Sequence, residues 1–313
     1  MSDDTSRKRA RLDEGEEAVE LPTDDCTADA EFWFDDGNII LEAKGTQFKV
    51  YEGPLIAHSP FFRDMLSLPQ PQGATAGNAP PLVKLPESPE DLRHFLRALM
   101  PSKEIRPFIP PQRPFNAVSA CIRLGHKYQV DRLVEEGLKY LRTLYPDDFS
   151  TLEKRRDEEV PDAAYAISVV NIARLTGADY LLPVALAQCC QLRSDIVKGF
   201  RREDGTCEYL STVDLGRCFQ AKELLIEARV QAALSIFDGI PAKDCLEVVP
   251  LCRGDVFRKW WPALSYCVPS LCRECDDMLA RANTQKQREL FFRLPELVGV
   301  VVQEWRRKNR MPY

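Results

Sequence analysis

The stretch that most constrains the fold is residues 35–66, where a pattern typical of two strands passes directly into a helical one. Asp36-Gly37-Asn38 is a turn signal before alternating apolar residues, and Lys44-Gly45-Thr46 separates these from a second alternating run. Period-two runs joined by a short glycine turn predict a β-hairpin. Ser59-Pro60 then starts a helix, because serine caps a helix and proline fits its first position. We therefore expect a small sheet covered by helices.

The rest of the front third extends this pattern. After a Pro- and Gly-rich loop at 67–81, Leu82, Val83 and Leu85 predict a third strand. Ser88 is a candidate N-cap for the helix that follows. Two more helices lead to Tyr145-Pro146, and Asp131 is a plausible N-cap of the second.

Beyond residue 146 every convincing pattern is helical. The candidate helices cover about 162–176, 179–193, 211–238, 242–251, 268–280 and 283–308. Thr176-Gly177 is a helix stop signal, and Asp204-Gly205 marks a turn. The expected fold class is α+β, a three-stranded sheet capped by helices and followed by a mostly α-helical C-terminal domain.

Charge and length divide the chain into three parts. Residues 1–30 hold four basic and ten acidic side chains, which accounts for the whole net charge of −6. We expect residues 1–29 to be a disordered acidic tail, residues 30–145 to form the mixed domain and residues 146–313 the helical domain. A folded body that carries no net charge attracts nucleic acid poorly, so direct nucleic-acid binding is disfavoured.

The tail also contains a short basic stretch, Arg7, Lys8, Arg9 and Arg11. It matches a nuclear-import signal, although a solvated charge run explains it too. The sequence has no run of eighteen apolar residues and a hydrophilic N-terminus, so neither a membrane span nor a secretory signal is expected. Eleven cysteines without a secretion signal indicate a reducing compartment, which makes the expected location nuclear, cytoplasmic or both.

Cysteines are the best candidates for chemistry. Five of them fall within 31 residues: Cys245, Cys252, Cys267, Cys272 and Cys275. The two-residue gap between Cys272 and Cys275 allows both thiolates to reach one zinc ion. The other gaps do not have zinc-knuckle spacing, and thiols three apart on a helix also simply pack in a core. Buried core thiols are the favoured interpretation, and a zinc site or thiol enzyme is the alternative.

Histidine-based catalysis has little support. The chain has only His58, His94 and His126, far apart in sequence and each within a helical pattern, where packing or a satisfied hydrogen bond explains them. No Gly-x-Ser-x-Gly, His-Glu-x-x-His or Gly-x-Gly-x-x-Gly motif occurs. We expect no enzyme activity, no catalytic, cofactor or metal residue, no cofactor and no small-molecule substrate. Trp260-Trp261 and Trp305 are interpreted as packing anchors and not as a surface for single-stranded nucleic acid.

The order of these segments resembles the BTB/POZ family. Leu55, Ser59 and Phe62 fill that family's Leu-x-x-x-Ser-x-x-Phe helical spacing, between the hairpin and the third strand. The segments SPFFRDMLSLPQP, LPESPEDLRHFLRALM and YLSTVDLGRCFQAKELL are similar to BTB proteins abundant in mushroom-forming fungi, over residues 36 to about 300. Tyr51-Glu52-Gly53-Pro54, Pro86 and Met100-Pro101 depart from the family pattern in surface loops.

The resemblance implies a protein–protein interaction module. It implies self-association as a homodimer through the first strand and helix region, docking to a cullin-type ubiquitin ligase scaffold as an adaptor, or both. Three consecutive aromatic residues, Phe32, Trp33 and Phe34, are candidates for the exposed interface, although they also fit a partly buried first strand. A nuclear regulator that recruits partners through the BTB domain is the alternative function.

Overall fold

The computed structural model describes residues 26–68, 80–100, 114–155, 162–237 and 273–305, together with Asn309. The strands are β1 (Thr27–Trp33), β2 (Ile39–Ala43), β3 (Thr46–Val50), β4 (Leu82–Leu85), β5 (Phe200–Arg201) and β6 (Cys207–Glu208). The helices of the front part are α1 (Glu52–His58), α2 (Pro60–Ser67), α3 (Pro89–Leu99), α4 (Phe115–Lys127) and α5 (Asp131–Leu144). The later helices are α6 (Phe149–Lys154), α7 (Tyr165–Thr176), η1 (Asp179–Leu181), α8 (Leu182–Cys189), η2 (Cys190–Lys198), α9 (Thr212–Phe237) and α11 (Arg273–Leu297).

Four strands form the main sheet, in the order β1-β3-β2-β4. β2 and β3 are the predicted antiparallel hairpin, and β4 lies parallel to β2 after the helical pair α1 and α2. β1 adds a fourth strand, parallel to β3, so the expectation of three strands was wrong. The folded body also begins at Thr27, three residues before the predicted boundary at residue 30.

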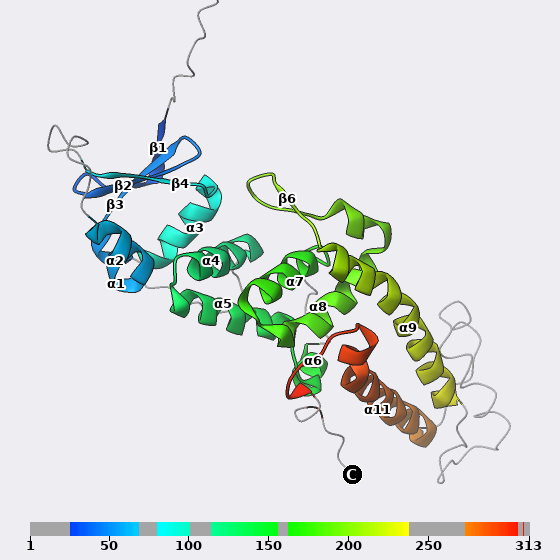
Figure 1. Ribbon diagram of the computed structural model, residues 1–313. Helices are drawn as coiled ribbons and strands as arrows, with labels where there is room; N and C mark the ends of the chain where they lie inside the picture. Colours follow the sequence, from blue (N-terminus) through cyan, green and yellow to red (C-terminus); the bar gives the residue numbers. More distant parts are fainter. Residues whose placement is uncertain are drawn as a thin grey trace, which may run out of the picture.

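Two hydrophobic cores follow one another along the molecule. The sheet core is built from buried residues of β2, β3, α2 and α3, among them Leu41, Phe48, Phe62 and Phe95. The helical core collects residues of α7 and α8, such as Ile167 and Leu186, and receives side chains from α9 and α11. Figure 1 shows the sheet with α1 to α3 at one end and α7 to α11 toward the other.

Helices α4 and α5 belong to both cores. Leu124 and Leu133 pack in the sheet core, whereas Ile122 and Leu141 pack in the helical core. Gly137 allows α5 to pack closely on α4, because a Cβ there would lie 2.4 Å from the Ile122 Cγ1 atom. The two cores therefore meet within the α4–α5 pair, and their division does not coincide with the predicted boundary at residues 145/146.

The structure departs from the sequence prediction in further helices and strands. β5 and β6 form a two-stranded hairpin around the predicted turn at Asp204-Gly205, where only helix was expected. α11 runs unbroken from Arg273 to Leu297, in place of two helices divided near residue 281. Asp131 is the first residue of α5 and not its cap, because Val130 occupies the cap position without a side-chain bond. The predicted helix at 242–251 lies outside the described residues.

Candidate interaction surfaces and the junction of the two cores

The predicted Leu-x-x-x-Ser-x-x-Phe motif lies across the junction of α1 and α2. Leu55, Ser59 and Phe62 are all fully buried. The Ser59 hydroxyl accepts a hydrogen bond from the Phe62 backbone N–H at 3.0 Å and donates one to the Tyr128 carbonyl at 2.5 Å. Ser59 thus caps α2 and joins it to the end of α4. The motif is explained by packing and capping alone.

The added strand β1 is fastened to α3 by two ion pairs. Arg93 donates from Nε and Nη2 to Asp29 at 3.0 and 2.8 Å, and Arg97 Nε donates to Glu31 at 2.8 Å. Burial acts to raise the pKa of Asp29, but hydrogen bonds from Arg93 and from two backbone N–H groups hold that pKa below its ordinary value. β1 is therefore an integral edge of this sheet.

The three aromatic residues at the end of β1 have different environments. Phe32 is buried in the sheet core, and Phe34 stacks on the Tyr51 ring at a centroid distance of 5.0 Å. Trp33 alone is clearly exposed, at 39% of its surface. Phe32 and Phe34 therefore match the alternative interpretation, in which the aromatic residues belong to a partly buried first strand, although Phe34 directly follows β1. Only Trp33 stays a candidate contact residue.

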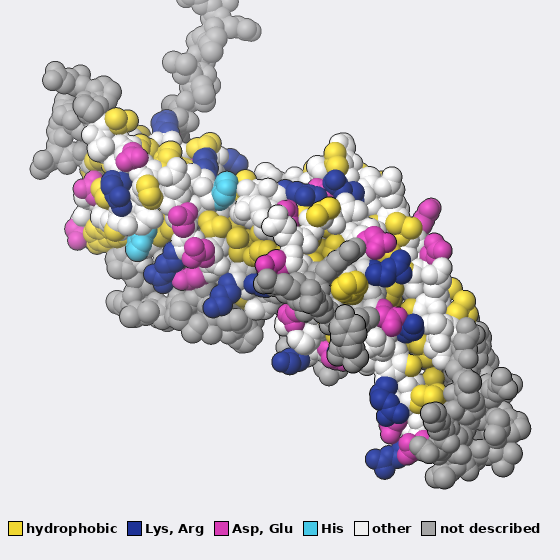
Figure 2. All heavy atoms as spheres, turned by 60° about the horizontal axis from the view of Figure 1, so that its bottom comes forward, with side chains coloured by type: hydrophobic (Ala, Val, Ile, Leu, Met, Phe, Trp, Pro, Cys, Tyr) yellow, Lys and Arg dark blue, Asp and Glu magenta, His cyan; other side chains and the backbone are white. Residues whose placement is uncertain are grey.

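α2 adds a second exposed apolar region on the same end of the molecule. Phe61 and Leu68 are both exposed, and the Phe61 ring also contacts the buried Tyr128 ring at 5.3 Å. At the far edge of the sheet Leu82 of β4 is exposed as well. Figure 2 shows hydrophobic side chains reaching the surface at this sheet-and-helix end. Exposed aromatic and aliphatic groups of this kind often mark protein contacts.

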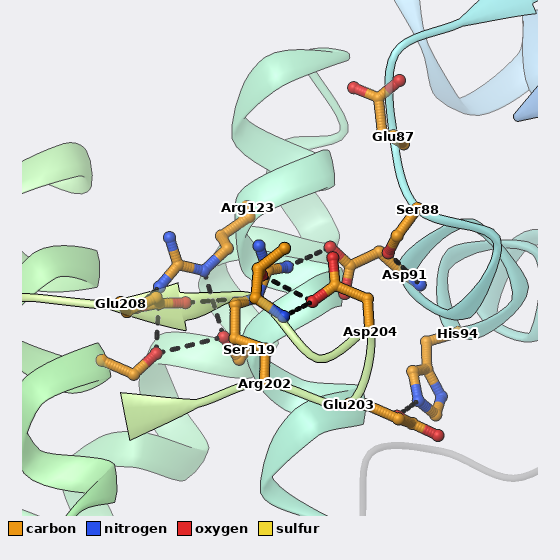
Figure 3. A network of polar contacts seen from close by, with 12 residues as sticks. Glu87, Ser88, Asp91, His94, Ser119, Arg123, Arg202, Glu203, Asp204 and Glu208 are labelled. Atoms are coloured by element: carbon orange, nitrogen blue, oxygen red, sulfur yellow. Dashed lines mark hydrogen bonds and ion pairs between the residues drawn. The ribbon is translucent and has the colours of Figure 1, made fainter. Parts of the chain in front are cut away.

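A polar network lies where the β5–β6 hairpin meets α3 and α4. Arg202, which directly follows β5, pairs with Asp91 of α3, and Arg123 of α4 pairs with Glu208 of β6. Figure 3 shows these side chains pointing toward one another from the three elements. Arg202 also approaches Glu208 at 3.3 Å, which links the two pairs into one network. The network spans up to 111 residues of sequence and holds the hairpin against the front domain.

The electrostatics of this network indicate a structural role. Burial raises the pKa of Asp91 in spite of the facing Arg202, and burial lowers the pKa of Arg123. Breaking one partner of a buried pair leaves the other charge unpaired and is strongly destabilising. Opposite charges that satisfy each other in this way fix the orientation of two elements. The two ion pairs Asp91–Arg202 and Arg123–Glu208 balance in charge.

Two serines at the edge of the network do not have the surroundings of a nucleophile. The hydroxyls of Ser119 and Ser168 lie 3.4 Å apart. Arg123 donates to both, from Nε to Ser119 at 3.1 Å and from Nη2 to Ser168 at 2.9 Å. An activated serine needs a base that accepts its proton. Here the contact is a permanent hydrogen-bond donor, so the arrangement positions α4 against α7 and does not prepare a reaction.

The histidines lie apart from one another. His94 Nε2 contacts Glu203 at 2.7 Å and its Nδ1 contacts Arg97 at 3.1 Å, which fits the expectation of a satisfied hydrogen bond. His58 and His126 are exposed at the ends of α1 and α4, where packing does not hold them.

Most of the predicted zinc ligands cannot be placed. Cys245, Cys252, Cys267 and Cys272 lie outside the described residues, and Cys275 is buried in α11. No group of three potential metal ligands occurs among the residues that the structure places. Another thiol cluster, Cys189, Cys190 and Cys218, joins η2 to α9, and Cys190 donates to the Cys218 carbonyl at 3.4 Å. A hydrogen bond with Cys189 raises the pKa of Cys218 to about 12, which suits a buried thiol and not a reactive one.

Trp305 is a packing anchor, as predicted. Its ring is buried and stacks on Phe291 at 4.8 Å, and its indole N–H donates to the Phe291 carbonyl at 3.1 Å. Trp260-Trp261 and the basic stretch from Arg7 to Arg11 lie outside the described part of the chain, so both interpretations stay predictions.

The sequence did not predict this polar network, because the ion pairs that join the hairpin to α3 and α4 link residues 111 and 85 positions apart and no local pattern connects them. Comparison with protein-family models, characterised proteins and solved structures gives no match to this chain. Within the described ranges, none of the helices is both long and apolar enough to cross a membrane.

Proposed function

We propose that the chain is a protein-interaction adaptor whose residues 30–145 form a BTB/POZ-like domain. The order of elements supports this proposal: a hairpin, the helical pair α1 and α2, the strand β4, then α3 and the pair α4 and α5. It is the order that the resemblance implies, and the Leu55, Ser59 and Phe62 motif occupies its expected place between β3 and β4. The proposal assigns no catalytic role to the chain.

The observation that carries the proposal is the exposed end of this domain. β1 and β4 are the two outer strands of the main sheet, and no other strand among the described residues pairs with their outer edges. An outer strand presents unpaired backbone groups to which a partner chain can add a strand. Trp33 lies at the end of β1 and Phe61 on α2, and both side chains are exposed. Aromatic anchors of this kind dominate binding energies in protein interfaces.

We infer two kinds of partner for this end of the molecule. One is a second copy of the chain, which gives a homodimer through the first strand and helix region. The other is a protein scaffold of the cullin type, for which the chain acts as an adaptor. The loops around Tyr51 and Pro86 depart from the family pattern, so scaffold binding needs its own test with a purified cullin.

Affinity capture with matched surface variants tests the proposal. The tagged intact chain, Trp33→Glu, Phe61→Glu and the control Leu175→Glu are compared, since Leu175 is equally an exposed apolar residue but lies on α7. We expect the intact chain and the control to retain the same proteins, including an untagged copy of the chain. Trp33→Glu or Phe61→Glu should lose them. Equal retention by all four forms, with unchanged helical content, would overturn the proposal.

A further inference from the structure

α9 has apolar residues on two opposite faces. Its inner face packs on α8 and α11 through buried residues that include Cys218, Ala221 and Ala228. On the opposite face lies an outer row, defined as Phe219, Ile226, Val230 and Leu234, which are exposed by 56, 54, 52 and 52%. Figure 1 shows α9 on the outside of the helical half. Hydrophobic side chains also reach the surface in this region in Figure 2.

The outer row is too regular to be scattered exposure. Single exposed apolar residues are normal on a protein surface. The outer row instead has spacings of seven, four and four, which places all four side chains on one side of the helix. It extends for about 22 Å at a rise of 1.5 Å per residue. A helix that is apolar on both sides is usually covered on both.

The charges beside the outer row favour one kind of cover. With Phe219 and Ile226 at heptad position d, Val230 is at position a, Lys222 is at g, and Glu227 and Leu234 are at the flanking position e. In a parallel pair of such helices, residue g of one helix meets residue e of the next heptad on the other. Lys222 of each copy would therefore meet Glu227 of the second copy, on both sides of the seam.

An antiparallel pair lacks this match. Each flank of α9 would then face the same flank of the second copy, which brings Arg229 toward Arg229 and Glu227 toward Glu227. Like charges across a seam are destabilising and suppress the wrong pairing. The charge pattern thus favours two copies in parallel.

We propose that α9 pairs in parallel with α9 of a second copy of this chain, through the outer row. The inner face of α9 is already occupied by α8 and α11, so pairing needs no rearrangement of the helical core. Glu223 lies at position a of the seam, where a polar residue sets the register at a cost in stability. A seam this short is small for a stable interface, so we expect reversible association in the micromolar range.

Sedimentation velocity of the full chain over a range of concentrations tests this pairing. Ile226→Glu should weaken association at least tenfold, because it places a charge in the seam. Lys222→Glu should do the same, and Lys222→Glu combined with Glu227→Lys should restore association. The matched control is Leu224→Glu, since Leu224 is an exposed apolar residue of the same helix that lies outside the seam. Circular dichroism establishes that each variant is folded.

Three results would overturn the proposal. Equal association of Ile226→Glu and the unchanged chain would show that the outer row is not a contact between copies. A lower melting temperature of Ile226→Glu without any change in mass would indicate that another part of the same chain, and not a second copy, packs on the outer row. Failure of the charge exchange to restore association would exclude the parallel arrangement.

This pairing adds a second contact to the function proposed above and does not require the front domain to bind anything. The two proposals fail separately. Loss of association in Trp33→Glu alone would support the front contact and remove the α9 contact, and loss in Ile226→Glu alone would do the reverse.

Discussion

At the scale of single residues, Ser59 shows how one side chain joins the start of α2 to the end of α4. Its hydroxyl caps α2 through the Phe62 N–H, and it also satisfies the carbonyl of Tyr128, 69 residues away. Ser59 is fully buried, so the Phe62 N–H and the Tyr128 carbonyl cannot form hydrogen bonds with water in its place. A buried polar group that loses its partner pays its full desolvation cost.

Ser59→Ala should therefore lower the free energy of unfolding by about 2 kcal/mol, which combines a lost cap with an unsatisfied buried carbonyl. Urea unfolding followed by circular dichroism measures this change. The control is Ser67→Ala on the same helix, because the exposed Ser67 hydroxyl bonds only to the Asp64 carbonyl. Equal stability of the two variants would show that the Ser59 contacts contribute nothing.

Asp214 is likewise a buried polar residue that takes part in capping a helix, here at the start of α9. The Ser211 hydroxyl accepts from the Asp214 N–H at 3.1 Å and donates to the Asp214 carboxylate at 3.1 Å, which resembles a capping box. Arg174 and Arg217 also donate to this buried carboxylate, at 2.8 and 2.9 Å. Burial acts to raise the pKa of Asp214, but the hydrogen bond and charge of Arg174 hold it below the ordinary value.

Asp214→Asn should lose stability in a pH-dependent way. Because the folded pKa is lowered, the ionised carboxylate contributes fully above the ordinary pKa of 3.8 and loses this contribution as pH falls through the folded pKa. The unfolding free energies of the original chain and the variant should differ most near pH 7 and converge below pH 3.8. Urea titrations at several pH values measure the difference, and a gap that stays constant down to pH 3 would contradict the assigned role.

At the scale of elements, the sequence predicted those turns, caps and hairpins that depend on residues close together in the chain. The β2–β3 hairpin, the Ser88 cap on Asp91 N–H and the helix stop at Gly177, with φ of 69°, were all predicted and are confirmed. The extent of β1 was not predicted. Phe32, Trp33 and Phe34 were considered for a first strand, but the inward Asp29 of this strand is acceptable only with Arg93, which lies 64 residues further on. The β5–β6 hairpin depends in the same way on α3 and α4.

The close packing of α4 on α5 gives a test at this scale. Gly137→Ala should lower the free energy of unfolding by about 1–3 kcal/mol, because its Cβ would overlap the buried Ile122 side chain. Gly216→Ala in α9 should raise that free energy by about 0.5–1 kcal/mol, since alanine favours a helix and nothing lies within 4 Å of the added carbon. Thermal unfolding of both variants measures these two changes in stability. Shifts of the same sign would show that the contact between α4 and α5 is looser than described.

At the scale of the whole molecule, α4 and α5 make the two cores one continuous body. The length of the chain predicted two domains, and the pattern of strands and helices placed their division after residue 145. In the structure, however, Ile122 packs in the helical core and Leu124, two residues further on, packs in the sheet core. Sequence periodicity shows which face of a helix is apolar, but it does not show which neighbour covers each turn of that face. The front domain is thus presented from a fixed position, and α9 lies toward the other end of the molecule (Figure 1).

Both proposed contacts make this chain a protein that binds its own copy, and its mass in solution tests that claim most directly. Sedimentation equilibrium of the intact chain should give a mass that rises with concentration above the 35.6 kDa of one chain. Trp33→Glu combined with Ile226→Glu should remain at the mass of one chain under the same conditions. A constant mass of 35.6 kDa for the intact chain, up to about 100 μM, would contradict the account, because weak interfaces still associate in that range.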